Sequence, residues 1–259
     1  MTETTSSTAS HRRRPLLVLG GVVLLAIGVA VVAAALGGRG PTASQPAPAE
    51  PASPAIITST APASPGPVPV AVFLGDSYTQ GFPPVPVEQR WSTLVAADAG
   101  WTEVNQGLGG TGFVTTSVMS ACGLEYCPTY VERVPGVIAA APDVVLIAGG
   151  QNDRAALAAD PDRVRAAVDA TYDQIRQGLP NARIIAVGPS TAEPATDLIV
   201  ELDAWVQAAA ARVGADYVSL IDPVVIEEDM IGPDQVHVNE AGYRAIADRV
   251  LTVAAADGP

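Results

Sequence analysis

The chain has 259 residues and a formal net charge of −13 at neutral pH, because 27 acidic side chains stand against 14 basic ones. A charge of that sign repels polyanions, which excludes nucleic acid as an expected partner and favours a neutral or weakly charged substrate. One of the two histidines, His11, lies near the N-terminus and far from the two cysteines. The single remaining histidine leaves too few ligands for a zinc site, so we expect neither a metal ion nor another cofactor.

A membrane-length apolar segment lies near the N-terminus. Three arginines at residues 12–14 precede residues 16–36, which carry no charge. A helix over this segment would be about 30 Å long, which matches the hydrocarbon core of a bilayer. Only Arg39 follows closely on the other side. The positive-inside rule therefore predicts a cytoplasmic N-terminus and an extracytoplasmic remainder.

Four regions are expected along the chain. A cytoplasmic tail (1–15) is followed by a single-pass transmembrane signal-anchor helix in the cell membrane (16–37), a linker rich in Pro, Ala and Ser (38–67) and a folded domain (68–259). The alternative is a signal peptide cleaved after the small residues 33–35, which would give a secreted protein. The domain is long enough for one sizeable core and one active site.

Within the domain, short β-branched runs alternate with longer segments of helical periodicity. This pattern is typical of a parallel sheet flanked by helices. The expected strands are residues 69–74, 102–105, 143–148, 183–188 and 216–221. The expected helices are residues 89–99, 130–140, 161–178, 197–213 and 240–255. Right-handed crossovers then predict an α/β fold, a three-layer α/β/α sandwich with a five-stranded parallel sheet.

Polar residues follow the first three strands at the carboxyl edge of the sheet, where such folds bind ligands. Ser77 follows the first strand, Asn105 ends the second and Asn152 follows the third. His237 lies between the last strand and the last helix, so it reaches the same edge. Taken alone, each residue has a structural explanation as a turn former, a helix cap or a surface residue. Their convergence on one edge indicates a functional site.

His237 is the one histidine of the predicted domain, since His11 belongs to the tail. Imidazole is the side chain best suited to proton transfer near neutral pH, so His237 is the candidate base. Asp234 lies three residues earlier, and this spacing favours it as the carboxylate that orients the ring. Asp222 and Asp229 are its rivals.

Cys122 and Cys127 are the only cysteines. On the extracytoplasmic side of a membrane, two cysteines this close in sequence are expected to form a disulfide that closes a small loop. The spacing does not fit the Cys-x-x-Cys pattern of redox enzymes.

With these residues placed, the chain resembles the SGNH hydrolases, also called the GDSL esterase and lipase family, over residues 70–255. Four sequence blocks of that family appear in order: Gly-Asp-Ser-Tyr at 75–78, Asn-Gln-Gly-Leu-Gly-Gly at 105–110, Gly-Gln-Asn-Asp at 150–153 and Asp-Gln-Val-His at 234–237. The family often has leucine where Tyr78 stands. Gly110 matches the family's oxyanion-hole glycine, with Gly109 and Gly112 as alternatives.

The resemblance implies a flavodoxin-like SGNH hydrolase fold and a Ser-His-Asp catalytic triad. Ser77 would be the nucleophile, His237 the base and Asp234 the residue that orients the imidazole. The backbone N–H groups of Ser77 and Gly110 and the side-chain amide of Asn152 would form the oxyanion hole that stabilises the tetrahedral intermediate.

The long loop at residues 106–129 lies beside the expected oxyanion hole and is a candidate wall of the substrate pocket. Phe113 and Tyr126 on this loop, together with Tyr78, are the residues expected to line it.

The expected function is that of a membrane-anchored, extracytoplasmic serine esterase for O-acyl esters of small molecules or glycans. Short acyl or acetyl groups on envelope carbohydrate are the favoured target, because the anchor and linker would place the enzyme beside the envelope. An acyltransferase that passes the group to a sugar hydroxyl, a lipase or lysophospholipase, and a non-catalytic SGNH-like binding module are the alternatives.

Overall fold

A computed structural model describes residues 66–255 of the chain. The predicted tail, the predicted signal-anchor helix and residues 38–65 of the predicted linker lie outside the described residues. Within residues 66–255, no helix has both the length and the apolar character needed to cross a bilayer.

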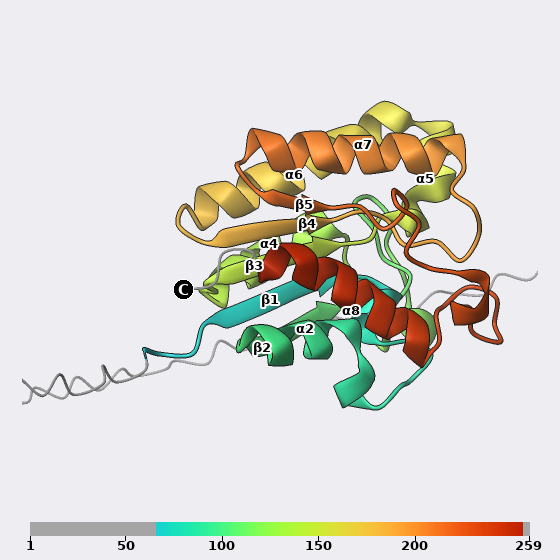
Figure 1. Ribbon diagram of the computed structural model, residues 1–259. Helices are drawn as coiled ribbons and strands as arrows, with labels where there is room; N and C mark the ends of the chain where they lie inside the picture. Colours follow the sequence, from blue (N-terminus) through green and yellow to red (C-terminus); the bar gives the residue numbers. More distant parts are fainter. Residues whose placement is uncertain (1–65, 256–259) are drawn as a thin grey trace, which may run out of the picture. The chain divides into compact units, whose positions relative to one another are not determined.

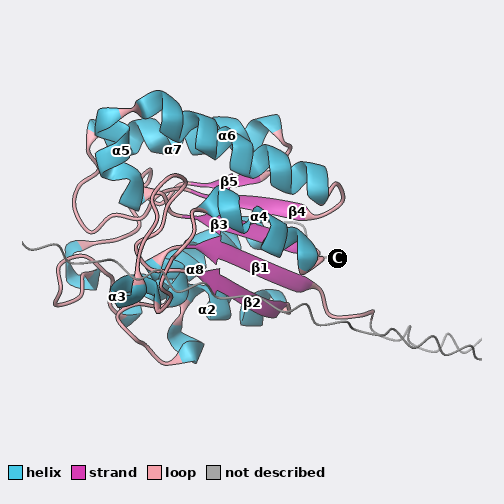
Figure 2. Ribbon diagram, turned by 180° about the vertical axis from the view of Figure 1, so that it is seen from behind, coloured by secondary structure: helices cyan, strands magenta, loops and turns pink. Residues whose placement is uncertain are grey.

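The five predicted strands are present and form one parallel sheet with the order β2-β1-β3-β4-β5. They are β1 (Val70–Gly75), β2 (Thr102–Gly107), β3 (Val144–Ala148), β4 (Arg183–Val187) and β5 (Asp216–Val218). Every residue of β3 is buried, as expected for a strand covered on both faces. The sheet is the middle layer in both ribbon views (Figure 1, Figure 2).

Strand β5 ends three residues earlier than predicted. The hydroxyl of Ser219 accepts hydrogen bonds from the backbone N–H groups of Ile221 and Asp222. This local turn ends the extended conformation at Val218 and redirects the chain toward the carboxyl edge.

Helices cover both faces of the sheet, so the predicted three-layer sandwich is confirmed (Figure 1). Helices α2 (Trp91–Ala99) and α8 (Glu240–Ala254) pack on one face, where Ala71 and Phe73 of β1 point. Helices α4 (Tyr130–Ala139), α6 (Pro161–Gly178) and α7 (Asp197–Arg212) cover the other face, where Val72 and Leu74 point. The alternation along β1 therefore divides the core into two halves.

The sequence did not predict the short helical segments in the connections. They are α1 (Ser77–Gln80), α3 (Met119–Cys122), α5 (Arg154–Ala159) and the 3-10 turns at Val87–Gln89, Gln151–Asp153 and Glu228–Met230. Each is too short to show a helical period in the sequence. Several of them carry the candidate site residues.

Candidate active site

The candidate nucleophile lies at the start of a tight strand-to-helix turn. Strand β1 ends at Gly75, Asp76 caps helix α1, and Ser77 is the first residue of that helix. A Cβ on Gly75 would lie 2.0 Å from Oγ1 of Thr79, so the turn requires glycine. As the first helical residue, Ser77 has a backbone N–H without an intrahelical partner.

Ser77, His237 and Asp234 form a continuous hydrogen-bonded series. Nε2 of His237 lies 2.9 Å from Oγ of Ser77, and Nδ1 lies 2.7 Å from Oδ2 of Asp234. Two segments that are 160 residues apart in the sequence thus meet at the carboxyl edge. Among the described residues neither rival carboxylate, Asp222 or Asp229, hydrogen-bonds the imidazole.

A tight loop fixes the orientation of the imidazole. Oδ1 of Asp234 accepts hydrogen bonds from the backbone N–H groups of Val236 and His237, at 3.0 and 2.9 Å. The hydroxyl of Tyr78 donates to the carbonyl of Val236 at 2.6 Å. The ring of Phe82 lies edge-on to the imidazole, with 4.9 Å between ring centroids. The loop, the nucleophile helix and the imidazole therefore form one packed unit.

The same contacts determine the charge of Asp234. Partial desolvation opposes ionisation, but the hydrogen bonds from the backbone and ring of His237 and from the backbone of Val236 outweigh it and lower the pKa of Asp234 to about 2. Asp234 is therefore an anion at every pH at which an imidazole base could act.

The candidate oxyanion-hole residues lie on neighbouring loops at the same edge. The side-chain amide of Asn152 donates one hydrogen bond to the carbonyl of Thr111, at 2.9 Å. An amide carries two hydrogens, so the second remains for a ligand. Gly110 has a φ of 72°, and a Cβ there would lie 2.6 Å from Oγ of Ser117. Glycine is required at 110 on both counts.

A buried carboxylate links the candidate nucleophile to the candidate oxyanion-hole segment. Asp76 is 1 % exposed and accepts hydrogen bonds from the backbone N–H of Tyr78, the hydroxyl of Tyr130 and the side-chain amide of Gln151. Burial raises the pKa of Asp76 to about 6, although these hydrogen bonds act in the opposite direction. Gln151 precedes Asn152, so Asp76 connects the two catalytic segments.

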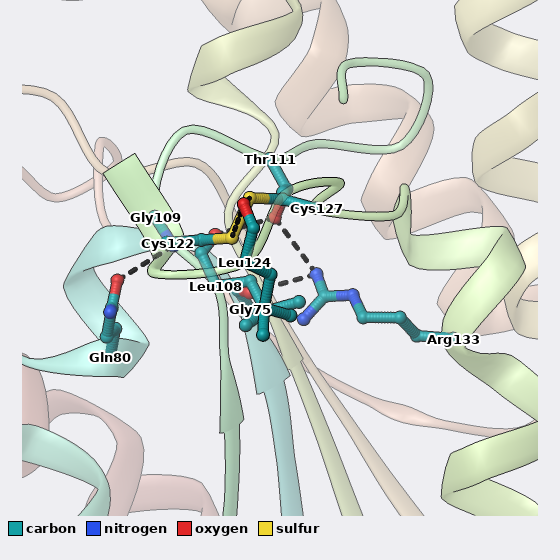
Figure 3. Close-up of a disulfide and its surroundings, with 9 residues drawn as sticks. All are labelled: Gly75, Gln80, Leu108, Gly109, Thr111, Cys122, Leu124, Cys127 and Arg133. Carbon is teal, nitrogen blue, oxygen red and sulfur yellow. Dashed lines mark hydrogen bonds between the residues drawn. A yellow bond between two sulfur atoms is a disulfide. The ribbon is translucent and has the colours of Figure 1, made fainter. Parts of the chain in front are cut away.

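Arg133 of α4 is a second buried residue of the site, and the sequence analysis missed it. Its guanidinium donates to the carbonyl of Gly75 and to the hydroxyl of Thr111 (Figure 3). It also donates to the carbonyl of Gln106. These acceptors lie at the ends of β1 and β2 and in the oxyanion-hole loop. Burial lowers the pKa of Arg133. One cation thus holds three segments of the site together.

The predicted disulfide joins Cys122 to Cys127 (Figure 3). An isolated antiparallel bridge pairs Cys127 with Ser117. Ala121 and Ser117 are the residues that a side chain at Gly110 would meet. The disulfide loop therefore packs directly behind the candidate oxyanion-hole glycine.

The three residues predicted to line the substrate pocket lie in different environments. Phe113 is 2 % exposed and packs against Tyr130 in the core, because Asp153 accepts hydrogen bonds from the backbone N–H groups of residues 113–115 and holds this segment inward. Tyr126 is 54 % exposed and donates to Glu132. Only Tyr78 adjoins a described pocket. The expectation for Phe113 is therefore wrong.

Residues 66–255 contain no group of three His, Cys, Asp or Glu side chains arranged to hold a metal ion. The expectation of a site without metal or cofactor stays a prediction.

Comparisons with known proteins agree with the four sequence blocks. A model of the GDSL-like Lipase/Acylhydrolase family matches residues 73–245. GDSL lipase Rv0518 of Mycobacterium tuberculosis is 33% identical over 119 residues, which are 42% of this chain and 49% of the relative. The chain thus spans about half the length of this curated relative.

Solved structures share the fold at low sequence identity. The psychrotrophic esterase EstA of Pseudoalteromonas sp. superposes with a TM-score of 0.53 and 15% identity, covering 71% of this chain and 95% of EstA. The family 3 carbohydrate esterase of Clostridium thermocellum superposes with a TM-score of 0.50 and 19% identity, covering 71% of this chain and 94% of that esterase.

Proposed function

The chain belongs to the GDSL-like lipase/acylhydrolase family, and from this premise we propose that it is a serine ester hydrolase that cleaves O-acyl esters through Ser77, His237 and Asp234. The observation that carries the proposal is the hydrogen-bonded series of these three side chains at the carboxyl edge of the sheet.

In the first half of the reaction, Ser77 attacks the ester carbonyl. Its hydroxyl proton passes to Nε2 of His237 as the new C–O bond forms. Asp234 accepts the hydrogen bond from Nδ1–H, which keeps Nε2 free to take that proton and stabilises the imidazolium. The imidazolium then gives the proton to the departing alcohol oxygen, and the acyl group remains on Ser77.

In the second half, water replaces the alcohol. His237 removes a proton from water as it attacks the acyl-enzyme, and returns that proton to Oγ of Ser77 as the acid leaves. In both tetrahedral intermediates the negative oxygen faces the backbone N–H groups of Ser77 and Gly110 and the amide of Asn152. One such donor typically contributes about 3 kcal/mol of transition-state stabilisation.

The proposed location is the extracytoplasmic face of the cell membrane, with the N-terminal helix as anchor. Support comes from the apolar segment at 16–36, the arginines before it and the linker after it. The proposed substrates are O-acyl esters of the envelope, including short acyl groups on carbohydrate.

Two alternatives remain. An acyltransferase would form the same acyl-enzyme and pass the group to a sugar hydroxyl, so products formed with and without a sugar acceptor distinguish it. A lipase-type activity is favoured by the name of the curated relative. A non-catalytic module does not explain the intact series of three side chains.

Kinetics on p-nitrophenyl acetate test the proposal. We expect hydrolysis by the full-length chain, and a loss of at least a thousandfold in kcat in Ser77→Ala and in His237→Ala. The matched control is Ser120→Ala, which removes an exposed hydroxyl in α3 and should leave kcat unchanged. Undiminished hydrolysis in either site variant would overturn the proposal.

A further inference from the structure

A pocket of about 680 Å³ lies between the connection from β4 to α7 and the connection from β5 to α8. The volume is that of a site for a small organic ligand. Its aliphatic lining comes from Leu220, Ile221, Val224, Ile226 and Ile231. None of its lining residues is aromatic, and none is lysine or arginine.

The pocket adjoins the reacting groups. A smaller pocket of about 140 Å³ shares Thr191, Glu193 and Gln235 with it and is also lined by Tyr78 and Val236. Tyr78 follows Ser77 in the chain, and Val236 precedes His237. The two pockets therefore form a groove that reaches the chain neighbours of the nucleophile and of the base.

Apolar side chains are exposed along this groove. Val236 is 56 % exposed beside the smaller pocket, and Val224 is 70 % exposed at the larger one. Apolar side chains left open beside a pocket indicate contact with an apolar ligand.

Three carboxylates line the larger pocket as well. Glu227 and Glu228 are exposed and have no ion-pair partner among residues 66–255. Glu193 lies 3.7 Å from Arg154, and both side chains are exposed, so solvent screens the pair. The larger pocket is therefore lined by three carboxylates and by no lysine or arginine, while Arg154 lines the smaller pocket beside Glu193. This lining disfavours an anionic group at the end of the larger pocket.

We propose that this pocket binds the acyl chain of the substrate, and that the chain is uncharged, aliphatic and longer than acetyl. The inference rests on the proposed ester hydrolysis and deepens it. An aliphatic chain matches the lining, whereas the hydroxyls of a sugar alcohol would lose hydrogen bonds to water against five branched aliphatic side chains. The three glutamates select against acyl chains that end in a negative charge.

A series of p-nitrophenyl esters from acetate to octanoate, measured with the full-length chain, tests which part of the substrate occupies the pocket. Each buried methylene should raise kcat/KM by about fourfold until the pocket is filled. A matched series of acetate esters with lengthening alcohols should stay flat. If the chain hydrolyses the acetate ester but kcat/KM does not increase with acyl length, the inference is overturned and ester hydrolysis still holds. If kcat/KM rises along the alcohol series instead, the pocket binds the alcohol and the inference is overturned as well.

A variant that fills the larger pocket tests whether this pocket causes the preference for long acyl chains. Ala195 lines the larger pocket but not the smaller one, so Ala195→Trp should lower kcat/KM for octanoate at least tenfold and leave acetate unchanged. Ala166→Trp, on the exposed side of α6, is the matched control and should leave both esters unchanged. Equal ratios of octanoate to acetate hydrolysis in the two variants would overturn the inference.

A second substrate pair tests the glutamates. The mono-p-nitrophenyl ester of octanedioic acid has the length of the octanoate ester but ends in a carboxylate. We expect the wild type to prefer octanoate, and Glu227→Gln/Glu228→Gln to narrow that preference by about two- to fivefold per carboxylate at low salt. Glu88→Gln/Glu201→Gln removes two exposed charges elsewhere and should leave the preference unchanged. An unchanged preference in the pocket variant would refute the role of the glutamates.

Discussion

At the scale of single residues, the site contains two carboxylates with opposite environments. Hydrogen bonds lower the pKa of Asp234 to about 2, whereas burial raises the pKa of Asp76 to about 6. A permanent anion thus lies beside the imidazole, and a carboxyl that can be neutral lies beneath the nucleophile helix. Environments that separate two pKa values in this way are typical of catalytic sites.

The proposed role of Asp234 predicts a loss of catalytic activity when its carboxylate is replaced. Asp234→Asn should lower kcat for p-nitrophenyl acetate by about 10⁴-fold, because an amide no longer holds the ring proton on Nδ1. The thermal unfolding midpoint should change little, since the loop is exposed to solvent. Asp229→Asn, a substitution at the rival that does not contact the ring, serves as the control. Equal kcat values for the two variants would contradict the assignment.

The buried Asp76 predicts how stability depends on pH. Because its pKa is raised from 3.8 to about 6 in the folded protein, the folded state binds more protons than the unfolded state between these values. Its contribution to the free energy of unfolding is therefore fully present below about pH 4 and is lost as pH rises through 6, on the order of 1–3 kcal/mol. Asp76→Asn removes this titration.

Unfolding free energies measured at several pH values from 4 to 7 check this dependence. The stability of Asp76→Asn relative to the wild type should increase as pH rises across the window. The exposed substitution Asp162→Asn should give a curve parallel to the wild type. Parallel curves for Asp76→Asn as well would mean that Asp76 does not titrate in this range.

Sequence reasoning found the residues that are rare or that stand at a strand end. His237 is the one histidine of the domain, and Ser77 and Asn152 follow strands. It missed the role of Arg133, because the partners of this residue come from distant segments and only the folded chain reveals its burial. It also placed Phe113 in the pocket, since the hydrogen bonds that Asp153 accepts from this segment, and that turn it inward, are not visible in a sequence.

At the scale of elements, the long helices and strands were predictable, and the short segments that carry the site were not. Helix α6 has the bounds that were expected, because eighteen residues show several helical periods and Asp160 and Pro161 mark its start. The one-turn helix α1 has no such period. Its position follows from the turn at Gly75, which depends on tertiary packing, and from the cap that Asp76 provides, which is a local interaction.

Arg133 of α4 should be the principal link between these elements. Arg133→Met keeps the apolar stem but leaves the carbonyls of Gly75 and Gln106 and the hydroxyl of Thr111 without their donor. We expect the free energy of unfolding to fall by about 3 kcal/mol, and kcat to fall more than KM rises, because these acceptors flank the nucleophile and the oxyanion-hole loop. Chemical denaturation and steady-state kinetics measure the two effects.

Arg165→Met on the exposed face of α6 is the matched control for this substitution. A loss of stability as small as in this control would show that the buried guanidinium does not hold the three segments together.

At the scale of the whole molecule, the composition and net charge restrict the expected class of partner. The order of tail, apolar segment, linker and domain predicts an extracytoplasmic location for the domain. The net charge of −13 disfavours polyanionic partners, and the proposed role of the glutamates in the larger pocket would extend that restriction to the substrate. The sequence did not predict this pocket, because its walls come from two connections, β4 to α7 and β5 to α8, without regular periodicity.

The proposed anchor makes a prediction for the intact cell. The full-length chain should stay in the membrane fraction after extraction with alkaline carbonate, because a helix over residues 16–36 would be held by the hydrocarbon core. Protease added outside spheroplasts should digest the domain. Release of the chain into the carbonate supernatant, or protection of the domain from external protease, would contradict the proposed topology.

Ester hydrolysis by the proposed mechanism requires that Ser77 is the group that is acylated. The direct measurement is peptide mapping by mass spectrometry after the full-length chain reacts with a fluorophosphonate, which mimics the ester and stays on an activated serine. We expect one adduct, on the peptide that contains Ser77, and its loss in His237→Ala. An adduct on another serine in a catalytically active preparation, or unchanged labelling without His237, would contradict the account.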